Sequence, residues 1–465
     1  MATPAPRATT RGAGMPAPRV VDALVVEIGS TTTVVSAFVG LSGEEPGVKP
    51  ALLAQGVAAT SVADGDVTIG VNRARGALEA RTGLLAPRAV LATSSAAGGL
   101  RMTVHGLTQR MTAMAAREAA LGAGAVVKHQ TAGKLRAADV GRIDEQRPNL
   151  ILLAGGVEGG DVETVLHNAR VLTKLTSRPI VVYGGNSAVR DEARELLLKA
   201  GFAVKVTANV YPAIDELDIV PARAVIHDAF EEHITHAPGM NRISEIVTGK
   251  ILPTPGAVLI AAERLAEDLG DLMVIDVGGA TTDVHSITDG SPDINAIQTE
   301  PQPHSKRTVE GDLGTFVSAQ HVADLMPPAE RPDPLPPALP ATEAEVQAAR
   351  ALTRVCAVTG VQRHAGHIVQ LYTPTGRQTV ARGRDLTACR WVIGTGGALT
   401  RLPGGLELLE GTRSPTQAGG ERLLPPCDAR CALDSDYIFA TCGVLLSRFA
   451  PARVVELMRS SLGLP

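Results

Sequence analysis

The sequence is poor in aromatic residues and lacks a surplus of positive charge. Phe, Trp and Tyr together make up 2% of the 465 residues, and the formal net charge is −4. Nucleic-acid-binding proteins usually carry a basic surplus, often with aromatic side chains on which bases stack. We therefore expect no DNA or RNA partner.

Long hydrophobic runs are lacking as well. No stretch approaches the roughly 20 consecutive apolar residues that a membrane-spanning helix needs, so we expect no membrane span. Residues 1–19 are rich in Pro, Ala and Arg and contain no apolar segment of the kind found in signal peptides. This composition predicts a disordered tail over 1–19.

Cysteine is scarce and unevenly placed. An odd number of cysteines in a long chain favours reduced thiols and a cytoplasmic protein. The last three lack the paired short spacing of a zinc site, so we expect no metal there. The five cysteines all lie in the last quarter of the chain: Cys356, Cys389, Cys427, Cys431 and Cys442.

The sequence does contain enough apolar material for a large core. Hydrophobic residues make up 45% of the chain and charged residues 20%, and the length favours two or three domains. From about residue 88 to residue 225, predicted strands alternate with predicted helices, which indicates a Rossmann-like subdomain with a parallel sheet. Residues 326–341 contain seven prolines and are predicted to form a linker or an exposed loop.

Two distant stretches share one pattern. "ALVVEIGSTTTVVSAFVG", which begins at residue 23, and "LMVIDVGGATTDVHSI", residues 272–287, each predict a strand, a tight turn and a second strand. In each stretch an apolar run leads to a carboxylate, Glu27 or Asp276, which is followed by glycine and hydroxyl residues. The chain therefore repeats this unit.

The repeated turns have the chemistry of a phosphate site. Turns of Gly, Ser and Thr offer backbone N–H groups and hydroxyls to phosphate oxygens, and two such hairpins facing one another would hold a triphosphate from both sides. Neither stretch fits a P-loop or a Rossmann turn, because both continue into a strand. The alternative is a pair of ordinary hairpins with small turn residues. The predicted nucleotide-binding residues are Gly29, Ser30, Thr31, Thr32, Gly278, Gly279, Ala280, Thr281 and Thr282.

Acidic residues and a third glycine cluster extend this candidate site. We expect Glu27, Asp276 and Asp283 to hold Mg²⁺, partly through water, and Asp276 also to orient the attacking water. Glu310 and Asp312 either support the metal or the ribose, or have a structural role. A predicted strand ends in a cluster that would approach a base or ribose closely: Gly394, Thr395, Gly396 and Gly397.

With these motifs the chain resembles the actin/sugar-kinase/heat-shock ATPase superfamily. More narrowly, it is similar to the glutamate mutase accessory proteins, the MutL-type family linked to adenosylcobalamin-dependent mutases. At Glu27 the sequence departs from the family pattern, which usually has Asp, so its carboxylate extends one methylene further. The motifs that carry the resemblance are "EIGSTTT" (27–33), "ATSSAAGGLRM" (92–102), "NLILLAGGVEGGD" (149–161), "DVGGATTDVHS" (276–286), "RTVEGDLG" (307–314) and "DSDYIFATCG" (434–443).

The resemblance implies a fold and a function. The fold would be an α/β, two-lobed actin-like ATPase (ribonuclease H-like) fold, with a first lobe over 20–265 that contains the inserted subdomain and a second lobe over 266–465. The function would be that of an ATP- and Mg²⁺-dependent reactivating chaperone, which helps a partner adenosylcobalamin-dependent mutase to exchange damaged cobalamin. A homo-oligomer is compatible with this. Two alternatives stay open: a small-molecule kinase of the same fold, and a nucleotide-gated binding module without catalysis.

Overall fold

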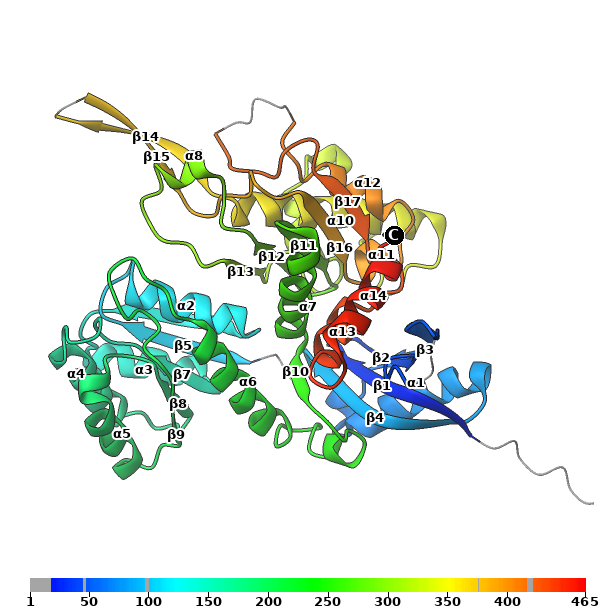
Figure 1. The fold of residues 1–465 in the computed structure, drawn as a ribbon, viewed down its shortest axis with the longest axis horizontal. Helices are drawn as coiled ribbons and strands as arrows, with labels where there is room; N and C mark the ends of the chain where they lie inside the picture. Colours follow the sequence, from blue (N-terminus) through cyan, green and yellow to red (C-terminus); the bar gives the residue numbers. More distant parts are fainter. Residues whose placement is uncertain (1–17, 45–46, 97–99, 375, 416–420) are drawn as a thin grey trace, which may run out of the picture.

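The structure, a computed structural model, describes residues 18–44, 47–96, 100–374, 376–415 and 421–465. Most of the tail predicted for 1–19 lies outside the described residues, and Arg19 already begins the first strand. Within the described ranges the strands form three five-stranded sheets and one two-stranded hairpin. Helices pack around all three sheets (Figure 1).

The first sheet is built around the N-terminal hairpin. Its elements are β1 Arg19–Ile28, β2 Thr32–Val39, β3 Ala51–Ala59, α1 Val67–Thr82, β4 Leu85–Ser94 and β10 Ile251–Pro253. The strand order is β10-β4-β1-β2-β3. The first three strands pair antiparallel, whereas β4 and β10 continue the sheet in parallel. The last eight residues of β1 are all buried, as expected for a central strand with both faces covered.

The second sheet repeats this plan. Its elements are β11 Leu272–Val277, β12 Thr282–Ile287, β13 Ser305–Glu310, α10 Glu343–His364, β16 Trp391–Thr395 and β17 Arg430–Leu433. The order is β13-β12-β11-β16-β17, again with three antiparallel strands followed by two parallel ones. Two copies of this strand order are the hallmark of the two-lobed, ribonuclease H-like fold. The fold class expected from the sequence is confirmed.

The third sheet is the parallel one. Its strands are β5 Arg101–Gly106, β6 Val126–Ala132, β7 Leu150–Leu153, β8 Ile180–Tyr183 and β9 Val204–Val206. Its helices are α2 Thr112–Gly122, α3 Ala137–Gln146, α4 Glu163–Leu172 and α5 Arg190–Lys199. The order β6-β5-β7-β8-β9 is that of a doubly wound fold of the flavodoxin type. We refer to this sheet and its helices as the insert.

The insert begins later than the sequence pattern indicated. The strand at 88–94, which was expected to open the alternating region, is part of β4 and pairs with β1 over nearly its whole length. The parallel sheet instead starts at Arg101. Alternation of strands and helices does not reveal which neighbour a strand pairs with, because both sheets contain parallel strands joined by helices.

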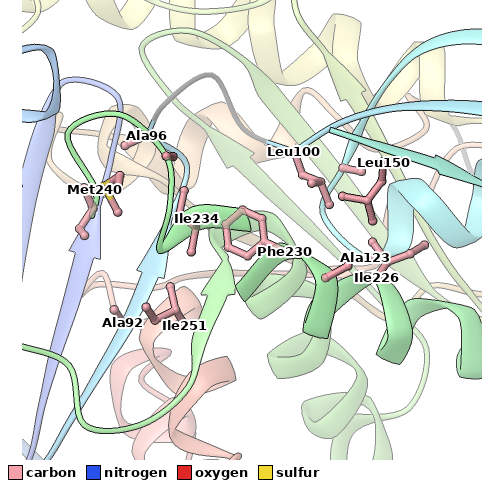
Figure 2. Close-up of a cluster of buried hydrophobic side chains, with 14 of the residues drawn as sticks. Ala92, Ala96, Leu100, Ala123, Leu150, Ile226, Phe230, Ile234, Met240 and Ile251 are labelled. Carbon is pink, nitrogen blue, oxygen red and sulfur yellow. The ribbon is translucent and has the colours of Figure 1, made fainter. Parts of the chain in front are cut away.

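One continuous core joins the first sheet to the insert. Figure 2 shows side chains of α6, Val220–Ile234, lying between Ala92 of the first sheet and Leu150 of the insert. Phe230, in the C-terminal half of this helix, is 1% exposed. A rigid attachment of the insert to the first sheet follows from this packing.

Two helices lie between the duplicated sheets. They are α7 Thr254–Leu269 and α13 Phe439–Leu445. Both belong to a buried cluster that contains Val25 of β1 and Val274 of β11. Helix α7, in the middle of the molecule in Figure 1, packs against strands of both sheets, and α13 packs against α7 and against β1 and β4.

The remaining α-helices and strands complete the fold. They are α8 Pro292–Asn295, α9 Ala319–Asp324, β14 His367–Thr373, β15 Gly376–Arg382, α11 Gly397–Thr400, α12 Gly405–Glu410 and α14 Pro451–Ser461. The β14–β15 hairpin projects from the body (Figure 1). A single 3-10 turn, Pro328–Glu330, interrupts the proline-rich stretch 326–341. Among the described helices, none combines the length and the apolar composition that crossing a membrane requires.

Candidate functional site

The two repeated hairpins line one cleft. Its volume is about 310 Å³, and its walls come from both duplicated sheets. Each turn is closed by the same hydrogen bond: the Gly29 N–H donates to the carbonyl oxygen of Thr32, and the Gly278 N–H donates to that of Thr281, both at 2.9 Å. Glycine fits these turns because a Cβ at Gly29 would lie 2.8 Å from the Thr32 carbonyl oxygen.

Most of the predicted site residues lie in this cleft. The carboxylates Glu27, Asp276 and Asp283 form part of its lining. The predicted nucleotide-binding residues that also line it are Gly29, Ser30, Thr31, Thr32, Gly278, Gly279, Ala280, Thr281 and Gly397. The structure therefore brings together, from both halves of the chain, the hydroxyl and glycine residues that a phosphate group could contact.

Four predicted residues do not line the cleft and have structural roles instead. The Thr282 hydroxyl is buried and donates to the Leu313 carbonyl at 2.8 Å. The buried Thr395 hydroxyl donates to Asp434 at 2.9 Å. A side chain at Gly394 would meet Leu409 and Leu433, and one at Gly396 would meet Asp276. Of the third glycine cluster, Gly397 lines the cleft, whereas Gly394, Thr395 and Gly396 lie outside its lining.

The cleft holds buried carboxylates with raised pKa values. Burial raises the pKa of Asp276 to about 8, with further contributions from the negative charges of Asp283 and Glu27. Burial also raises the pKa of Glu27 to about 7, against a hydrogen bond that lowers it. Acids with pKa values near neutral pH accept and release protons readily, which suits a group that orients or deprotonates water.

Asp283 is neutralised by a buried arginine. Arg307 is 1% exposed, and its Nε donates to Asp283 Oδ1 at 2.8 Å. Its Nη1 also donates to the carbonyl oxygens of Leu121 and Ala125 in the insert, at 2.9 and 3.0 Å. Sequence reasoning assigned Arg307 no role, although it begins the "RTVEGDLG" motif. The arginine ties the second hairpin to the insert and lowers the pKa of Asp276 through its charge.

The donor set of the cleft fits a hydrated Mg²⁺. In the described ranges no three His, Cys, Asp or Glu side chains form a group that could hold a metal ion by themselves. Two carboxylates, the buried Glu27 and the half-buried Asp276, nevertheless face the cleft without a cationic hydrogen-bond partner among the described residues. Mg²⁺ typically binds through one or two carboxylates, with waters and phosphate oxygens completing its shell. When bound, such an ion would supply charge neutralisation on the phosphates.

A segment near the C-terminus completes the first hairpin. The Tyr437 hydroxyl donates to Glu27 Oε1 at 2.6 Å, across 410 residues of sequence. Tyr437 is held with φ 51°, a left-handed conformation that is uncommon for a tyrosine. Asp434, which is fully buried, accepts from the backbone N–H groups of Ile438 and Phe439 and so caps α13. Both residues lie in the motif at 434–443, but the sequence alone indicated no role for either of them.

Replacement of this tyrosine tests the contact. We expect Tyr437→Phe to lower the free energy of unfolding by about 1–2 kcal/mol at pH 8, because a buried carboxylate loses its donor. The loss should shrink at pH 6, where Glu27 is protonated and the hydrogen bond to its charged form no longer contributes. Urea unfolding at both pH values measures this. Tyr372→Phe on β14, where the side chain is 84% exposed, is the control and should change neither value. Equal losses at both pH values would contradict the assignment.

The structure also places the proline-rich stretch and the acidic pair of the sequence analysis relative to the cleft. Pro337 and Pro340, from the stretch expected to be a linker or an exposed loop, line the cleft. Glu310 and Asp312, by contrast, lie outside the lining, and both accept from Arg363 Nη1, at 2.8 and 2.7 Å. This ion-pair cluster gives the acidic pair a structural role rather than a metal or ribose contact.

Comparison with known proteins places the chain in a family. A family model described as MutL protein matches residues 23–462. The chain is 36% identical over 470 residues to Protein MutL of Clostridium tetanomorphum, covering 94% of this chain and 98% of that protein.

Solved structures resemble it more distantly. They include a nucleotide-free acetone carboxylase (14% identity, 91% of this chain and 70% of that chain, TM-score 0.36). A nucleotide-free diol dehydratase-reactivating factor (11% identity, 91% and 99%, TM-score 0.32) and a glycerol dehydratase reactivase (10% identity, 91% and 99%, TM-score 0.30) are similar at the same level. The sequence match over nearly the whole length decides the assignment and confirms the resemblance seen in the motifs: the chain belongs to the MutL protein family.

Proposed function

We propose that this protein binds and hydrolyses ATP with Mg²⁺ in the cleft between the hairpins, and that it uses this cycle as an accessory, reactivating factor of an adenosylcobalamin-dependent mutase. The observation that supports ATP binding most directly is the pair of matched glycine turns that face one cleft. Membership of the MutL family supports a mutase as the partner protein. We propose that this protein and the mutase together exchange damaged cobalamin for intact cofactor.

The residues of the cleft would divide the work. The turn N–H groups and the hydroxyls of Ser30, Thr31 and Thr281 would bind phosphate oxygens. Asp276 would hold the attacking water and take up its proton, and Glu27 would sit on the opposite wall near the metal. Arg307 would hold the Asp283 carboxylate in place through their hydrogen bond. Catalysis would then rest on positioning and on neutralisation of charge.

The duplicated sheets would form the two moving bodies. We assign residues 20–265, including the insert, to a first lobe and residues 266–465 to a second lobe. Because the cleft takes its walls from both sheets, a bound triphosphate would favour the closed arrangement, and hydrolysis would release it. If a mutase binds one arrangement more tightly than the other, this difference in affinity would couple mutase binding to the nucleotide cycle.

Blocking the cleft tests nucleotide binding. We expect Gly279→Val to weaken ATP affinity at least about tenfold, since a branched side chain takes up space in the phosphate turn. The fold should tolerate it, because the nearest atom to a Cβ there is that of Phe316, at an ordinary 3.6 Å. Calorimetric titration with Mg²⁺ and ATP measures the affinity. Gly311→Val, at a site outside the cleft with open space around its Cβ, is the matched control.

The complete proposal is tested by turnover in the presence of a partner. Purified protein should release ADP and phosphate from ATP, and an adenosylcobalamin-dependent mutase from the same genome, inactivated by turnover, should regain activity only when both ATP and this protein are added. Gly279→Val should abolish the rescue. ATP turnover that depends instead on an added sugar or acid would favour a small-molecule kinase, and tight ATP binding without ADP release would favour a nucleotide-gated binding module.

A further inference from the structure

A second large cavity lies on the far side of the edge strand β13. Its volume is about 650 Å³, and it shares no lining residue with the nucleotide cleft. Along β13 the side chains alternate between the two sites: Lys306 and Thr308 line the cavity, whereas Arg307 between them is bonded to Asp283. The cavity is therefore a separate site that the proposed ATP cycle does not use.

The lining of this cavity is strongly basic in a chain of net charge −4. Two carboxylates, Glu310 and Glu421, belong to the lining, and Arg363 already holds Glu310 at 2.8 Å. The cationic lining residues are Arg117, Lys306, Arg363, Arg382, Arg384 and Arg422.

Three of the basic side chains stand in one row. His367 of β14 pairs directly with Arg382 of β15 on one side, and forms a backbone bridge with Arg422 on the other. Residues directly opposite one another on antiparallel strands project from the same face, about 5 Å apart at Cβ. All three side chains line the cavity, so its wall carries a row of basic groups.

No carboxylate neutralises this row within the described residues. Arg382 and Arg422 have no ion pair there, and the Arg422 guanidinium donates to a neutral carbonyl, that of Gln362, at 2.6 Å. The Nε of Arg382 is buried with no hydrogen-bond partner. A buried donor without an acceptor is costly, and such groups usually mark a missing partner.

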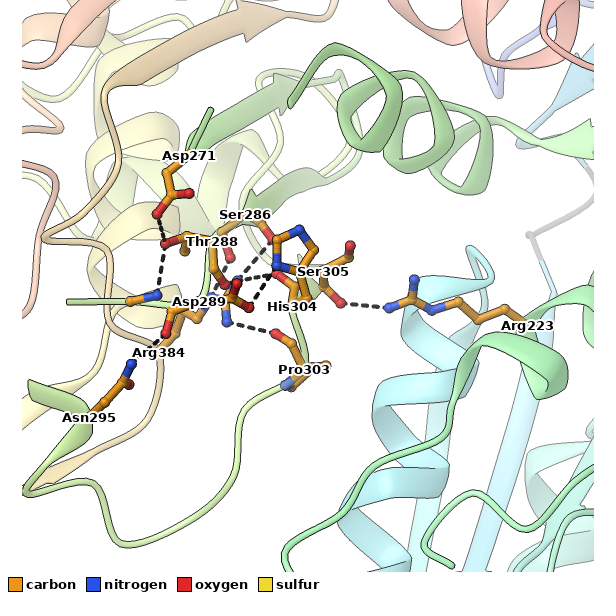
Figure 3. A network of polar contacts seen from close by, with 11 residues as sticks. Arg223, Asp271, Ser286, Thr288, Asp289, Asn295, Pro303, His304, Ser305 and Arg384 are labelled. Carbon is orange, nitrogen blue, oxygen red and sulfur yellow. Dashed lines mark hydrogen bonds and ion pairs between the residues drawn. The ribbon is translucent and has the colours of Figure 1, made fainter. Parts of the chain in front are cut away.

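Behind the row lies a further arginine that bonds only to neutral oxygens in the described ranges. Figure 3 shows Arg384 surrounded by Ser286, Thr288, Pro303 and His304, to whose oxygens its guanidinium donates at 2.6–3.2 Å. Arg384 is 2% exposed. These oxygens fix the side chain, and the nearby carboxylates of Glu118, Asp289 and Asp385 act on its charge from a distance without a direct ion pair in the described ranges.

We propose that this cavity binds a small phosphate-bearing anion. Guanidinium groups match the geometry of phosphate oxygens and bond to them with two parallel hydrogen bonds, and the volume lies within the range of small-molecule sites. Such a ligand would satisfy the buried Nε of Arg382 and neutralise the charges of Arg382 and Arg422. The proposal does not depend on ATP binding in the cleft.

Inorganic pyrophosphate is the probe for this site. In calorimetric titrations without Mg²⁺, the full-length Gly279→Val protein, whose nucleotide cleft is blocked, should bind pyrophosphate, and Arg382→Gln with Arg422→Gln in that background should weaken the affinity at least about tenfold. Arg422→Gln alone, at an exposed residue, should give a smaller loss in the same direction. Arg377→Gln is the matched control, because Arg377 lies exposed on the same hairpin outside the cavity.

Three outcomes would overturn the proposal. They are failure of pyrophosphate to bind, an equal loss of affinity in the Arg377→Gln control, and binding of a tetraglutamate peptide in place of pyrophosphate, which would mark the cavity as a site for acidic peptides. The same two arginine substitutions, made in the protein that keeps Gly279, should leave the ATP affinity unchanged. If only pyrophosphate binding is absent, the proposed function is unaffected. If Gly279→Val loses ATP binding, the proposed anion site is unaffected.

Discussion

Asp276→Asn is expected to reduce ATP hydrolysis at least about 100-fold while leaving ATP affinity within a few-fold of the parent. The amide has the size of the carboxyl group, so the cleft keeps its shape, but it cannot take up the proton of an attacking water. Loss of a positioned acid or base typically costs 10²- to 10⁴-fold in rate. Single-turnover assays and calorimetric titration with ATP separate the two effects.

The same variant should gain stability at alkaline pH without nucleotide or Mg²⁺. The pKa of Asp276 is about 8 in the folded protein, against 3.8 for an ordinary Asp. Between these values the folded state binds the proton more tightly than the unfolded state, so the parent loses stability as the pH rises through this window. Asn does not ionise and escapes this loss. We expect the variant to exceed the parent by a few kcal/mol at pH 8, on the order implied by the pKa shift, and by little near pH 4.

Urea unfolding across pH 4–8.5 measures this difference. Asp293→Asn, the same substitution at an exposed position of α8, is the control and should follow the parent at every pH. If the free energies of unfolding of the parent and Asp276→Asn depend on pH in the same way, the pKa of Asp276 is not raised. Undiminished ATP hydrolysis would show that Asp276 has no catalytic role.

Gly396→Ala should destabilise the protein by about 3 kcal/mol or more, whereas Gly397→Ala should change its stability by less than about 0.5 kcal/mol. Gly396 has φ +87°, and a Cβ there would lie 2.4 Å from Asp276 Oδ1 and 2.5 Å from the Val277 carbonyl oxygen. Both the left-handed conformation and the contact with main chain are unfavourable for alanine. Around Gly397, the next residue, a Cβ would meet no atom within 4 Å.

Thermal and urea unfolding of the two variants measure this contrast, and the adjacent position makes the control closely matched. Gly396→Ala should also lose ATP hydrolysis if enough folded protein can be prepared, since its methyl group displaces Asp276. Equal stability of the two variants would mean that the strand end can shift at little cost, and that Gly396 does not fix the position of the carboxylate.

The local parts of the site could be predicted from the sequence, and the long-range parts could not. The two hairpins are contiguous stretches, so their strands, turns and carboxylates could be identified from residue order alone. Tyr437 meets Glu27 across 410 residues, and Arg307 reaches Leu121 across 186. Such contacts leave no periodic signal in a single sequence.

The third glycine cluster shows the limit in another way. A strand that ends in glycines allows another group to approach the backbone closely, but the pattern does not indicate whether that group is a ligand or another part of the protein. At Gly396 the approaching group is the protein's own Asp276, and at Gly394 it is the side chains of Leu409 and Leu433. The pairing of β4 could not be predicted for the same reason. Its composition is that of a buried parallel strand in either sheet, and in the structure it pairs with β1 of the first sheet rather than with the insert.

The contact between Tyr437 and Glu27 also bears on how the protein is made. Chains grow at about 5–20 residues per second, so the hairpin around Glu27 would leave the ribosome roughly 20–80 seconds before the segment that carries Tyr437. During that interval Glu27 has no partner hydroxyl and α13 is missing from between the sheets. A nascent chain would therefore be unable to assemble the complete cleft until the segment that carries Tyr437 has emerged.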